Sequence, residues 1–468
     1  VLQCNNFEVV DLGVMVSCQD ILEAAKRHNA DIIGLSGLIT PSLDEMVHVA
    51  GEMQRLGMRQ PLMIGGATTS PAHTSVKIDP AYQGAVIYVK DASRAVGVAQ
   101  KLVGDQCEDY VGEIKADCQA RRQRHAGRKR QGPALTLEAA RSARRQLSWA
   151  QYQPPVPSYL GARTIEEIDC ATLVDYIDWM PFFNAWEFHG KFPEILTDDV
   201  VGEAASALYQ DAKAMLEDIV AGQWLDVKAA VGFFPAASNG DDIVLYADEA
   251  RESVQETLHC LRQQKRRRED LPQECLSDFV APAELGVSDY VGAFAVTAGL
   301  GVEARARAFE AAQDDYSAIL LKALADRFAE AGAEYLHERT RREWWGYASD
   351  ERLDNAALIA EKYRGIRPAP GYPACPDHSE KERLFRLLDA EDRAGMSLTE
   401  HFAMVPAASV SGWYFSHPES RYFALGQIGA DQVADYAARK GFTIETVERW
   451  LAPNLGYDPA DTTTADAA

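Results

Sequence analysis

Residues 367–378, RPAPGYPACPDH, bring together residue types that suit the binding of a small ligand. The four prolines lack backbone N–H donors and favour an extended, rigid path, and Gly371 supplies a turn that other residues make only with strain. Such a loop exposes carbonyl groups and aromatic faces, which suit a weakly hydrated cation. Arg367 at its start can bind a carboxylate through two parallel hydrogen bonds. The loop therefore predicts a ligand that carries both kinds of charge.

S-adenosylmethionine has both features, because it joins a sulfonium to an amino-acid tail. A proline-rich segment taken alone is more often a rigid surface loop that binds nothing. The composition of the loop leaves both interpretations open.

Small and hydroxyl side chains mark a second candidate site near the N-terminus. They follow apolar segments, at Ser36-Gly37 and in the run GGATTS from residue 65 to residue 70. Small residues let the backbone approach a flat ligand, and hydroxyl groups can hydrogen-bond it without adding charge. Taken singly, Gly65-Gly66 is explained as a tight turn and Thr40 as a helix N-cap. Their occurrence at consecutive strand ends favours a site.

The elements that must position this second site alternate along the chain. Apolar, β-branched runs occur at 7–14, 31–38, 60–67 and 84–90, and each is followed by a helical pattern. Alternating strands and helices predict a parallel, doubly wound sheet, whose ligands bind beyond the carboxyl ends of the strands. Ser17 and Asp91 are the expected N-caps of the first and last of these helices.

Residues 105–150 change character and are rich in arginine. Six basic side chains stand close together, at Arg121, Arg122, Arg124, Arg128, Lys129 and Arg130. We predict a solvated, partly helical basic linker, with docking to an acidic protein as the alternative.

Helices and strands are mixed from residue 151 onward. We predict helices at 199–221, 249–264, 301–342, 379–390, 431–440 and 443–451. Strands are predicted at 225–234, 242–248, 289–296, 409–417 and 421–429, with a turn at Asn239-Gly240. The sequence thus predicts a first domain over 1–104, a linker over 105–150, and an α+β domain with a largely antiparallel sheet over 151–468.

Charge and composition limit the classes of partner. The formal net charge of −23 argues against nucleic acid and anionic membranes, and no apolar run reaches the roughly 20 residues of a membrane span. The eight cysteines form no CxxC pair, so neither a zinc cluster nor a disulfide framework is expected. We expect a cytoplasmic protein. Because the chain opens on Val1, we also expect it to be part of a longer one.

Several long motifs, in order along nearly the whole chain, resemble cobalamin-dependent methionine synthase in its carboxyl-terminal half. The motifs that resemble its cobalamin-binding domain are VVDLGVMV, GLSGLITPSLDEM, GGATTSPAHTSVKI and YVKDASRAV. Those that resemble its activation domain, which binds S-adenosylmethionine, are YIDWMPFF, IRPAPGYPACPDH, SVSGWYFSHPESRYF and ERWLAPNLGY. The resemblance implies a flavodoxin-like, doubly wound α/β domain followed by an α+β activation domain.

The resemblance assigns cobalamin contacts in the first domain. Ser36 and Thr40 match positions that hydrogen-bond the nucleotide tail of cobalamin, and Ala92 matches a further contact. Gly65 and Gly66 match the small loop that lines the cavity for that tail.

In the second domain the resemblance assigns an S-adenosylmethionine site. Asp178 matches the carboxylate that meets the ligand's amino group, and Arg367 matches the residue that meets its carboxylate. The backbone from Ala369 to Tyr372 resembles the adenosyl-side wall. Tyr422 and Phe423 match an aromatic pair at the same site, and Phe423 lacks the hydroxyl group of those relatives that have a tyrosine as the second residue.

Asp326 and Glu330, four residues apart on a predicted helix, share one face. They resemble acidic groups that approach the corrin ring during reactivation, although a solvated helix face explains them equally well.

One family feature is missing from this sequence. In the family a D-x-H-x-x-G segment upstream of VLQCNNF supplies the histidine that ligates cobalt, and here it is absent together with the first βα unit of the domain. We therefore expect a truncated cobalamin domain, no metal ligand in this chain, and surface or structural roles for its histidines. The zinc-binding homocysteine module and the folate module are absent too.

The resemblance implies a reaction. In the whole enzyme, cobalamin carries a methyl group from methyltetrahydrofolate to homocysteine, and the cofactor is sometimes lost to oxidation as cob(II)alamin. This half is expected to restore it with a methyl group from S-adenosylmethionine and an electron from a flavodoxin-type protein or a flavoprotein reductase. The fragment is expected to be a monomer, to bind cobalamin weakly and to lack turnover alone. No catalytic side chain is required, because the task is positioning.

Two other classes of protein remain as alternatives. A non-catalytic corrinoid carrier or cobalamin-responsive regulator would share the first domain but have no use for RPAPGYPACPDH and YIDW. A methyltransferase of another kind would usually show a GxG loop after its first strand, and none occurs in that context.

Overall fold

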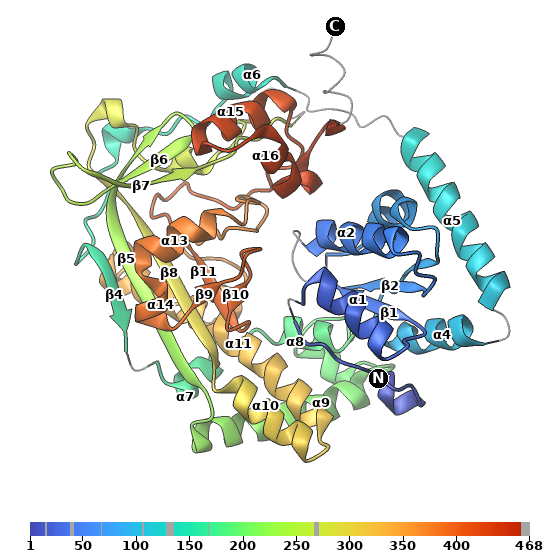
Figure 1. Ribbon diagram of the computed structural model, residues 1–468. Coiled ribbons are helices and arrows are strands. Elements are labelled where there is room, and N and C mark those ends of the chain that lie inside the picture. Colours follow the sequence, from blue (N-terminus) through green and yellow to red (C-terminus); the bar gives the residue numbers. More distant parts are fainter. Residues whose placement is uncertain are drawn as a thin grey trace, which may run out of the picture. The chain divides into compact units, whose positions relative to one another are not determined.

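The computed structural model describes residues 1–14, 16–37, 42–66, 68–104, 107–127, 135–166, 168–265 and 271–459. The chain forms two compact units, Val1–Gln131 and Gly132–Ala468 (Figure 1). The first contains a parallel sheet and the second an antiparallel one, which confirms the predicted fold class. In the described part of the chain, no helix is both long and apolar enough to cross a membrane.

The first unit is a doubly wound α/β layer structure. Its parallel strands follow the order β1 (Ile33–Ser36), β2 (Leu62–Gly65), β3 (Val86–Tyr88). The helices are α1 (Cys18–Arg27), α2 (Ser42–Arg55), α3 (Pro71–His73), α4 (Ala92–Val103) and α5 (Cys107–Gly127). Ser17 and Asp91 cap α1 and α4 by accepting from backbone N–H groups, as predicted.

Alternate side chains of the strands enter two different cores, because successive residues of a strand point to opposite faces. Leu62 and Ile64 of β2 pack with α1 and α2, whereas Met63 packs with Ile87 of β3 and with α4. Both faces of the sheet are therefore covered by helices.

The predicted strand at 7–14 is wrong. These residues have no regular structure and pair with no strand of the described chain. Val9, Val10, Leu12 and Val14 are exposed. A β-branched run becomes a strand only where a neighbour accepts its backbone hydrogen bonds, and this segment has none here.

Part of the predicted linker belongs to the first unit. Helix α5 packs on it, with Lys115 Nζ 2.7 Å from the Asp79 carboxylate. Arg122 binds the same carboxylate and the carbonyl of Ser75, so the prediction of a solvated tether is wrong for this residue. Arg128, Lys129 and Arg130 lie outside the described residues. The predicted domain boundaries and the docking of an acidic protein stay predictions.

The second unit is built on one antiparallel sheet of order β11-β8-β5-β6-β7, with β4 paired to β5. The strands are β4 (Gly161–Ile165), β5 (Asp226–Asn239), β6 (Asp242–Tyr246), β7 (Val254–His259), β8 (Asp289–Leu300) and β11 (Ser409–Tyr414). A small hairpin pairs β9 (Ser397–Leu398) with β10 (Met404–Val405). The predicted turn at Asn239-Gly240 joins β5 to β6.

Helices cover both faces of this sheet (Figure 1). Val231 and Phe233 of β5 enter the core made with the longer helices, and Phe234 enters the core made with α13 and α14. The helices are α6 (Leu137–Ser142), α7 (Cys170–Val174), α8 (Trp179–Ala185), α9 (Gly202–Gly222), α10 (Val302–Ala311), α11 (Asp315–Arg339), α12 (Asn355–Ile359), α13 (Glu380–Leu388), α14 (Ala390–Ala394), α15 (Ala430–Lys440) and α16 (Ile444–Trp450).

Three predicted elements of this unit need correction. The helix expected at 249–264 is instead strand β7, because pairing with β6 overrides local helical preference. The helix expected over 301–342 is two helices, separated where Gln313 has a φ of +62° and Asp314 caps α11. The strand expected at 421–429 has no regular structure apart from a bridge between Ile428 and Leu455.

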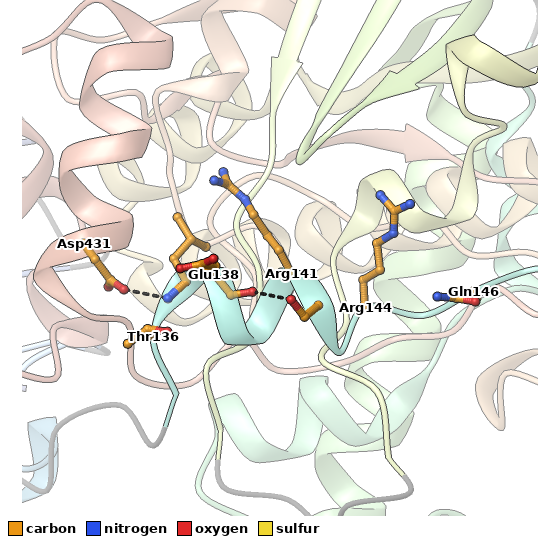
Figure 2. Close-up of a pocket in the computed structure, with 8 residues that line it drawn as sticks. Thr136, Glu138, Arg141, Arg144, Gln146 and Asp431 are labelled. Atoms are coloured by element: carbon orange, nitrogen blue, oxygen red, sulfur yellow. Dashed lines mark hydrogen bonds between the residues drawn. The ribbon is translucent and has the colours of Figure 1, made fainter.

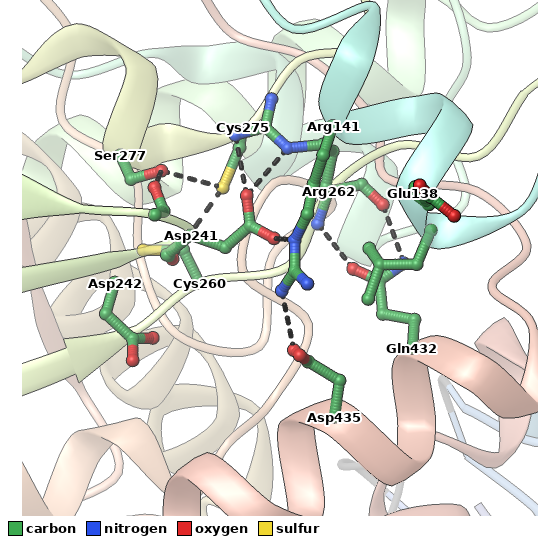
Figure 3. A network of polar contacts seen from close by, with 12 residues as sticks. Glu138, Arg141, Asp241, Asp242, Cys260, Arg262, Cys275, Ser277, Gln432 and Asp435 are labelled. Atoms are coloured by element: carbon green, nitrogen blue, oxygen red, sulfur yellow. Dashed lines mark hydrogen bonds and ion pairs between the residues drawn. The ribbon is translucent and has the colours of Figure 1, made fainter.

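Buried ion pairs connect distant parts of this unit. Arg262 is 1% exposed and contacts the carboxylate of Asp241 at 2.6 Å (Figure 3). It also contacts the carboxylate of Asp278 at 2.7 Å. Arg141 of α6 reaches Asp241 at 2.7 Å and Asp435 of α15 at 2.8 Å. These charges hold α6 and α15 against the β5–β6 turn.

A buried histidine, His417, should make the stability of this unit depend on pH. His417 lies edge-on to Trp149 and Tyr152, at ring distances of 4.9 and 4.6 Å. Burial lowers the pKa of His417 to about 4, helped by the positive charges of Arg364 and Arg145. The unfolded chain takes up this proton near pH 6.5, so the neutral ring stabilises the fold above that pH. This contribution is lost as the pH falls from about 6.5 toward 4.

We expect His417→Asn to remove about 1.4 kcal/mol per pH unit from the dependence of the free energy of unfolding on pH in this window. Asparagine retains an acceptor for the backbone N–H of Glu419, which now donates to His417 Nδ1 at 3.1 Å. Chemical denaturation at pH 7, 6 and 5 measures the slope. A variant with the same slope as the parent chain would contradict the assignment.

Candidate functional site

A cavity of about 280 Å³ lies at the carboxyl ends of the three strands in the first unit. It is lined by Gly34, Leu35, Ser36, Met63, Gly65, Gly66, Val89, Lys90, Asp91, Ala92 and Ala95. Four predicted cobalamin contacts, Ser36, Gly65, Gly66 and Ala92, thus come together at one cavity. The fifth, Thr40, lies outside the described residues.

The glycines of this cavity act in two ways. A Cβ atom on Gly34 would have no atom within 4 Å, so this wall is bare. Gly66 has a φ of +101°, and a Cβ atom there would lie 2.4 Å from the backbone of Gly37. Gly66 therefore lets two strand-end loops touch, and Gly34 leaves room for a ligand. Gly34 was not among the site residues predicted from the sequence, in which only its position near Ser36 could have suggested it.

The chemistry of the cavity suits a flat, largely uncharged group. Its walls are mostly glycine, alanine and aliphatic side chains, and the exposed hydroxyl of Ser36 makes no hydrogen bond within the described chain. Asp91 is occupied by the N–H of Arg94 at 2.9 Å. These features fit the aromatic base in the nucleotide tail of a cobalamin. No cluster of three His, Cys, Asp or Glu side chains that could hold a metal occurs among the residues described.

In the second unit the proline-rich loop is fixed to the sheet at its start. The backbone of Ile366 pairs with Phe415, and Pro368 O accepts from the N–H of Trp413 at 2.9 Å. Within the loop, the Gly371 N–H donates to Cys375 O at 2.7 Å. The predicted rigid path is therefore held by backbone bonds as well as by proline rings.

Within the loop, the backbone at Gly371 packs against the ring of His378, the last residue of the loop. Gly371 has a φ of +95°, and a Cβ atom there would lie 2.4 Å from Cε1 of the His378 ring. Lys381 Nζ donates to His378 Nδ1 at 2.8 Å, and burial lowers the pKa of His378 to about 4, so the ring is neutral. The loop can approach the ring this closely only because residue 371 is glycine.

Arg367 is held at one end of its guanidinium. Its Nη1 donates to Glu334 Oε2 at 2.6 Å and to the hydroxyl of Tyr363 at 3.2 Å. Its backbone N–H donates to the hydroxyl of Tyr422 at 2.9 Å. Burial would lower the pKa of Arg367, but Glu334 and the two phenols outweigh it and raise the pKa above its ordinary value. Arg367 is therefore a permanent cation beside the loop.

A buried histidine backs this arginine. His337 Nδ1 lies 3.4 Å from Arg367 Nη1, and its Nε2 lies 3.4 Å from the hydroxyl of Tyr347. Because arginine can only donate, Nδ1 must accept and the proton is assigned to Nε2. Burial, followed by the charges of Arg341 and Arg367, lowers the pKa of His337 well below its usual value. The ring is neutral at physiological pH.

Asp178 caps α8 and is half-buried. Its carboxylate accepts from the backbone N–H of Met180 at 3.0 Å. Helix α11, which carries Glu334, contacts α8, and Tyr176 donates to Glu338 of α11 at 2.6 Å. The structure thus links the segment of Asp178 and the partner of Arg367 to one helix, without a direct contact between Asp178 and Arg367.

The remaining predicted residues surround this helix and loop. Tyr372 is 55% exposed. Its pKa is raised, first by burial and then by the negative charge of Glu330, while the positive charge of Arg367 opposes the shift. Asp326 is exposed and Glu330 half-buried on successive turns of α11. Ala369 is buried, and Phe423 is partly buried and packs on the core that contains residues of α13 and β11.

Glu334, His337 and Tyr363 were not among the site residues predicted from the sequence. Glu334 continues the four-residue spacing of Asp326 and Glu330, which was the one available signal. Glu334 and His337 lie 33 and 30 residues before Arg367, whereas Tyr363 lies only four residues before it.

A larger hollow lies elsewhere, along α6 (Figure 2). It measures about 690 Å³ and is lined by Thr136, Leu137, Glu138, Arg141, Ser142, Arg144, Gln146 and Asp431. Arg141 is already paired with two carboxylates, and Asp431 accepts from the N–H of Leu137 at 2.6 Å. It contains no predicted site residue.

The contact between Gly371 and His378 can be tested by substitution. We expect Gly371→Ala to lower the free energy of unfolding by about 2–4 kcal/mol, because it adds a steric clash to the strain of a positive φ. Gly286→Ala is the matched control, since Gly286 has a φ of +62° with no atom within 4 Å of the added carbon. It should lose only about 1 kcal/mol. Equal losses in urea denaturation would show that the ring is not in contact.

The chain is similar to two described protein families and to a solved structure. Residues 169–441 match the family described as "Vitamin B12 dependent methionine synthase, activation domain", and residues 1–97 match the family "B12 binding domain". A crystal structure of the MetH reactivation domain bound to AdoHcy is 56% identical in sequence, with a TM-score of 0.68, and its match covers 70% of this chain and 100% of that one. The activation-domain match alone spans more than half of the sequence. The chain therefore belongs to the family of vitamin B12-dependent methionine synthases, with a B12-binding domain followed by an activation domain.

Proposed function

We propose that the second unit binds S-adenosylmethionine at Arg367 and the 367–378 loop, and that the chain uses it to reactivate cobalamin held by the first unit. The observation that carries this proposal is the free edge of Arg367. Its Nε and Nη2 atoms donate to no residue of the described chain, whereas Nη1 is fully engaged. The related reactivation domain is bound to AdoHcy, the molecule left when S-adenosylmethionine gives up its methyl group.

Each predicted residue has a role in this scheme. Arg367 binds the ligand's carboxylate side-on, and Asp178 receives its amino group. The backbone from Ala369 to Tyr372 lines the adenosyl group, and Tyr422 fixes the start of the loop through the N–H of Arg367. Phe423 acts through packing, because it has no hydroxyl.

The chain's contribution to methyl transfer is orientation. The sulfonium supplies an electrophilic methyl group, and a rigid loop holds it in one direction, which lowers the entropic part of the barrier. Asp326 and Glu330 are the candidate corrin contacts during this step. In the first unit, Ser36, Gly65, Gly66 and Ala92 hold the nucleotide tail of cobalamin, with Thr40 as a further contact.

The finer features of the whole enzyme are also part of the proposal. Together with its homocysteine module, which holds zinc, and its folate module, the protein would transfer methyl groups from methyltetrahydrofolate to homocysteine. A flavodoxin-type protein or a flavoprotein reductase would supply the electron for reactivation. The cysteines described are free thiols, in keeping with a reducing, cytoplasmic setting, and we propose that the protein acts as a monomer.

The placement of S-adenosylmethionine is tested by two substitutions. Arg367→Ala should weaken its binding by roughly 100-fold, because the ligand's carboxylate loses its bidentate partner. Asp178→Asn should weaken it by roughly 10-fold, since asparagine still caps α8 but carries no charge for the ammonium group. Isothermal titration calorimetry measures both affinities. Arg386→Ala, at a side chain 64% exposed, is the control and should bind as the parent does. Unchanged affinity in Arg367→Ala would show that S-adenosylmethionine does not bind at this loop.

The cobalamin cavity is tested by filling it. Gly34→Leu places a side chain in open space on the cavity wall, so it should weaken cobalamin binding by about 10-fold or more without disturbing the sheet. Gly97→Leu on α4 is the control, because it also has no atom within 4 Å but does not line the cavity. Equilibrium dialysis against hydroxocobalamin compares them. Equal binding by the two variants would contradict the site.

A further inference from the structure

The guanidinium of Arg367 has one committed end and one free edge. Nη1 faces three side chains, the carboxylate of Glu334 at 2.6 Å, the hydroxyl of Tyr363 at 3.2 Å and His337 Nδ1 at 3.4 Å. Nε and Nη2 donate to none of the described residues. A carboxylate can bind a guanidinium side-on through these two atoms.

Glu334 also lies close to a second arginine, Arg341. Its side chain is 9% exposed, and its Oε1 atom is buried without a hydrogen bond, 3.6 Å from Arg341 Nη1. Arg341 is fully buried and binds Glu351 through Nε at 2.9 Å and Nη2 at 2.7 Å. Glu351, Arg341, Glu334 and Arg367 therefore form a line of alternating charges. The line is electrically balanced before any ligand arrives.

We propose that Glu334 is a positioning residue, which holds the Nη1 end of Arg367 so that its Nε–Nη2 edge faces the carboxylate of the ligand. The proposal rests on the function proposed above and assigns to this site a requirement for an amino-acid carboxylate. Tyr363 and His337 share the task. His337 is neutral and can accept from the arginine, so it adds no competing positive charge.

The opposite role for Glu334 would be that of a competitor. A carboxylate beside Arg367 could occupy the place of the ligand's carboxylate and weaken binding until displaced. The geometry favours positioning, because Glu334 contacts the Nη1 end and leaves the side-on edge free. The two roles differ in sign. Removing a positioning residue weakens the binding of the ligand, whereas removing a competitor strengthens it.

The test uses the full chain and a pair of ligands that differ only in the carboxylate, S-adenosylmethionine and decarboxylated S-adenosylmethionine. Glu334→Gln should weaken the first by roughly 10-fold, which is the usual effect of losing one charged hydrogen bond. It should change the affinity for the second by less than about two-fold. Isothermal titration calorimetry measures all four affinities. Glu256→Gln is the matched control, since Glu256 is 10% exposed and also pairs with two arginines but lies on β7.

A milder variant guards against loss of folding. Tyr363→Phe removes one hydrogen bond to Nη1 without changing any charge, and it should weaken S-adenosylmethionine about three-fold with the same ligand selectivity. Thermal unfolding shows whether each variant is folded. If Glu334→Gln is unfolded, the result with Tyr363→Phe decides.

Three outcomes overturn the inference. Equal weakening of the two ligands would mean that Glu334 only supports the fold, tighter binding of S-adenosylmethionine would mean that it competes, and no change would mean that it has no role. The proposed function is judged separately by Arg367→Ala. If that substitution weakens ligand binding while Glu334→Gln does not, the proposed binding site is supported and the proposed role of Glu334 is wrong.

Discussion

The second unit depends on the pairing of charges that are buried within it. An ion removed from water is strongly unfavourable unless an opposite charge and hydrogen bonds replace its hydration. Lys440, with a side chain 1% exposed, meets this requirement by contacting Asp377 and Glu380 at 2.7 Å each. Arg262 does so with Asp241 (Figure 3) and with Asp278. Because each partner comes from a distant segment, satisfying these charges brings α15, the β5–β6 turn and the end of the 367–378 loop to fixed positions.

The same constraint shapes the site. One end of the proline-rich loop is tied to β11 by backbone hydrogen bonds, and the other ends at Asp377, which pairs with Lys440. Arg367 lies at the first attachment, between Ile366 and Pro368, and its Nη1 end pairs with Glu334. A loop fixed at both ends loses little entropy when a ligand binds, so more of the interaction energy appears as affinity. The cavity of the first unit works differently, since it offers bare glycine walls and one free hydroxyl in place of charge.

Prediction from the sequence succeeded where the signal is local. The cap at Ser17, the turn at Asn239-Gly240 and the alternation of apolar strands with helices were all readable, because each depends on residues close together in the chain. It failed where the secondary structure of a segment depends on whether another strand pairs with it. The run at 7–14 has the composition of a strand but no neighbour to pair with, and 249–264 has a helical pattern but becomes β7 beside β6. The 301–342 helix breaks because Gln313 adopts a positive φ and Asp314 starts a new helix.

The sequence by itself determined the family, the fold class and the identity of the loop that carries Arg367, since these follow from long motifs and from local residue preferences. Only the tertiary structure decided which atoms of Arg367 are free. Two partners of its Nη1 atom, Glu334 and His337, come from α11, 33 and 30 residues earlier in the chain, and the sequence does not show that they meet Arg367. The third, Tyr363, lies in the segment just before the loop. The physical reason is that a partly buried cation is neutralised by the groups that packing places beside it, and packing is a property of the whole fold.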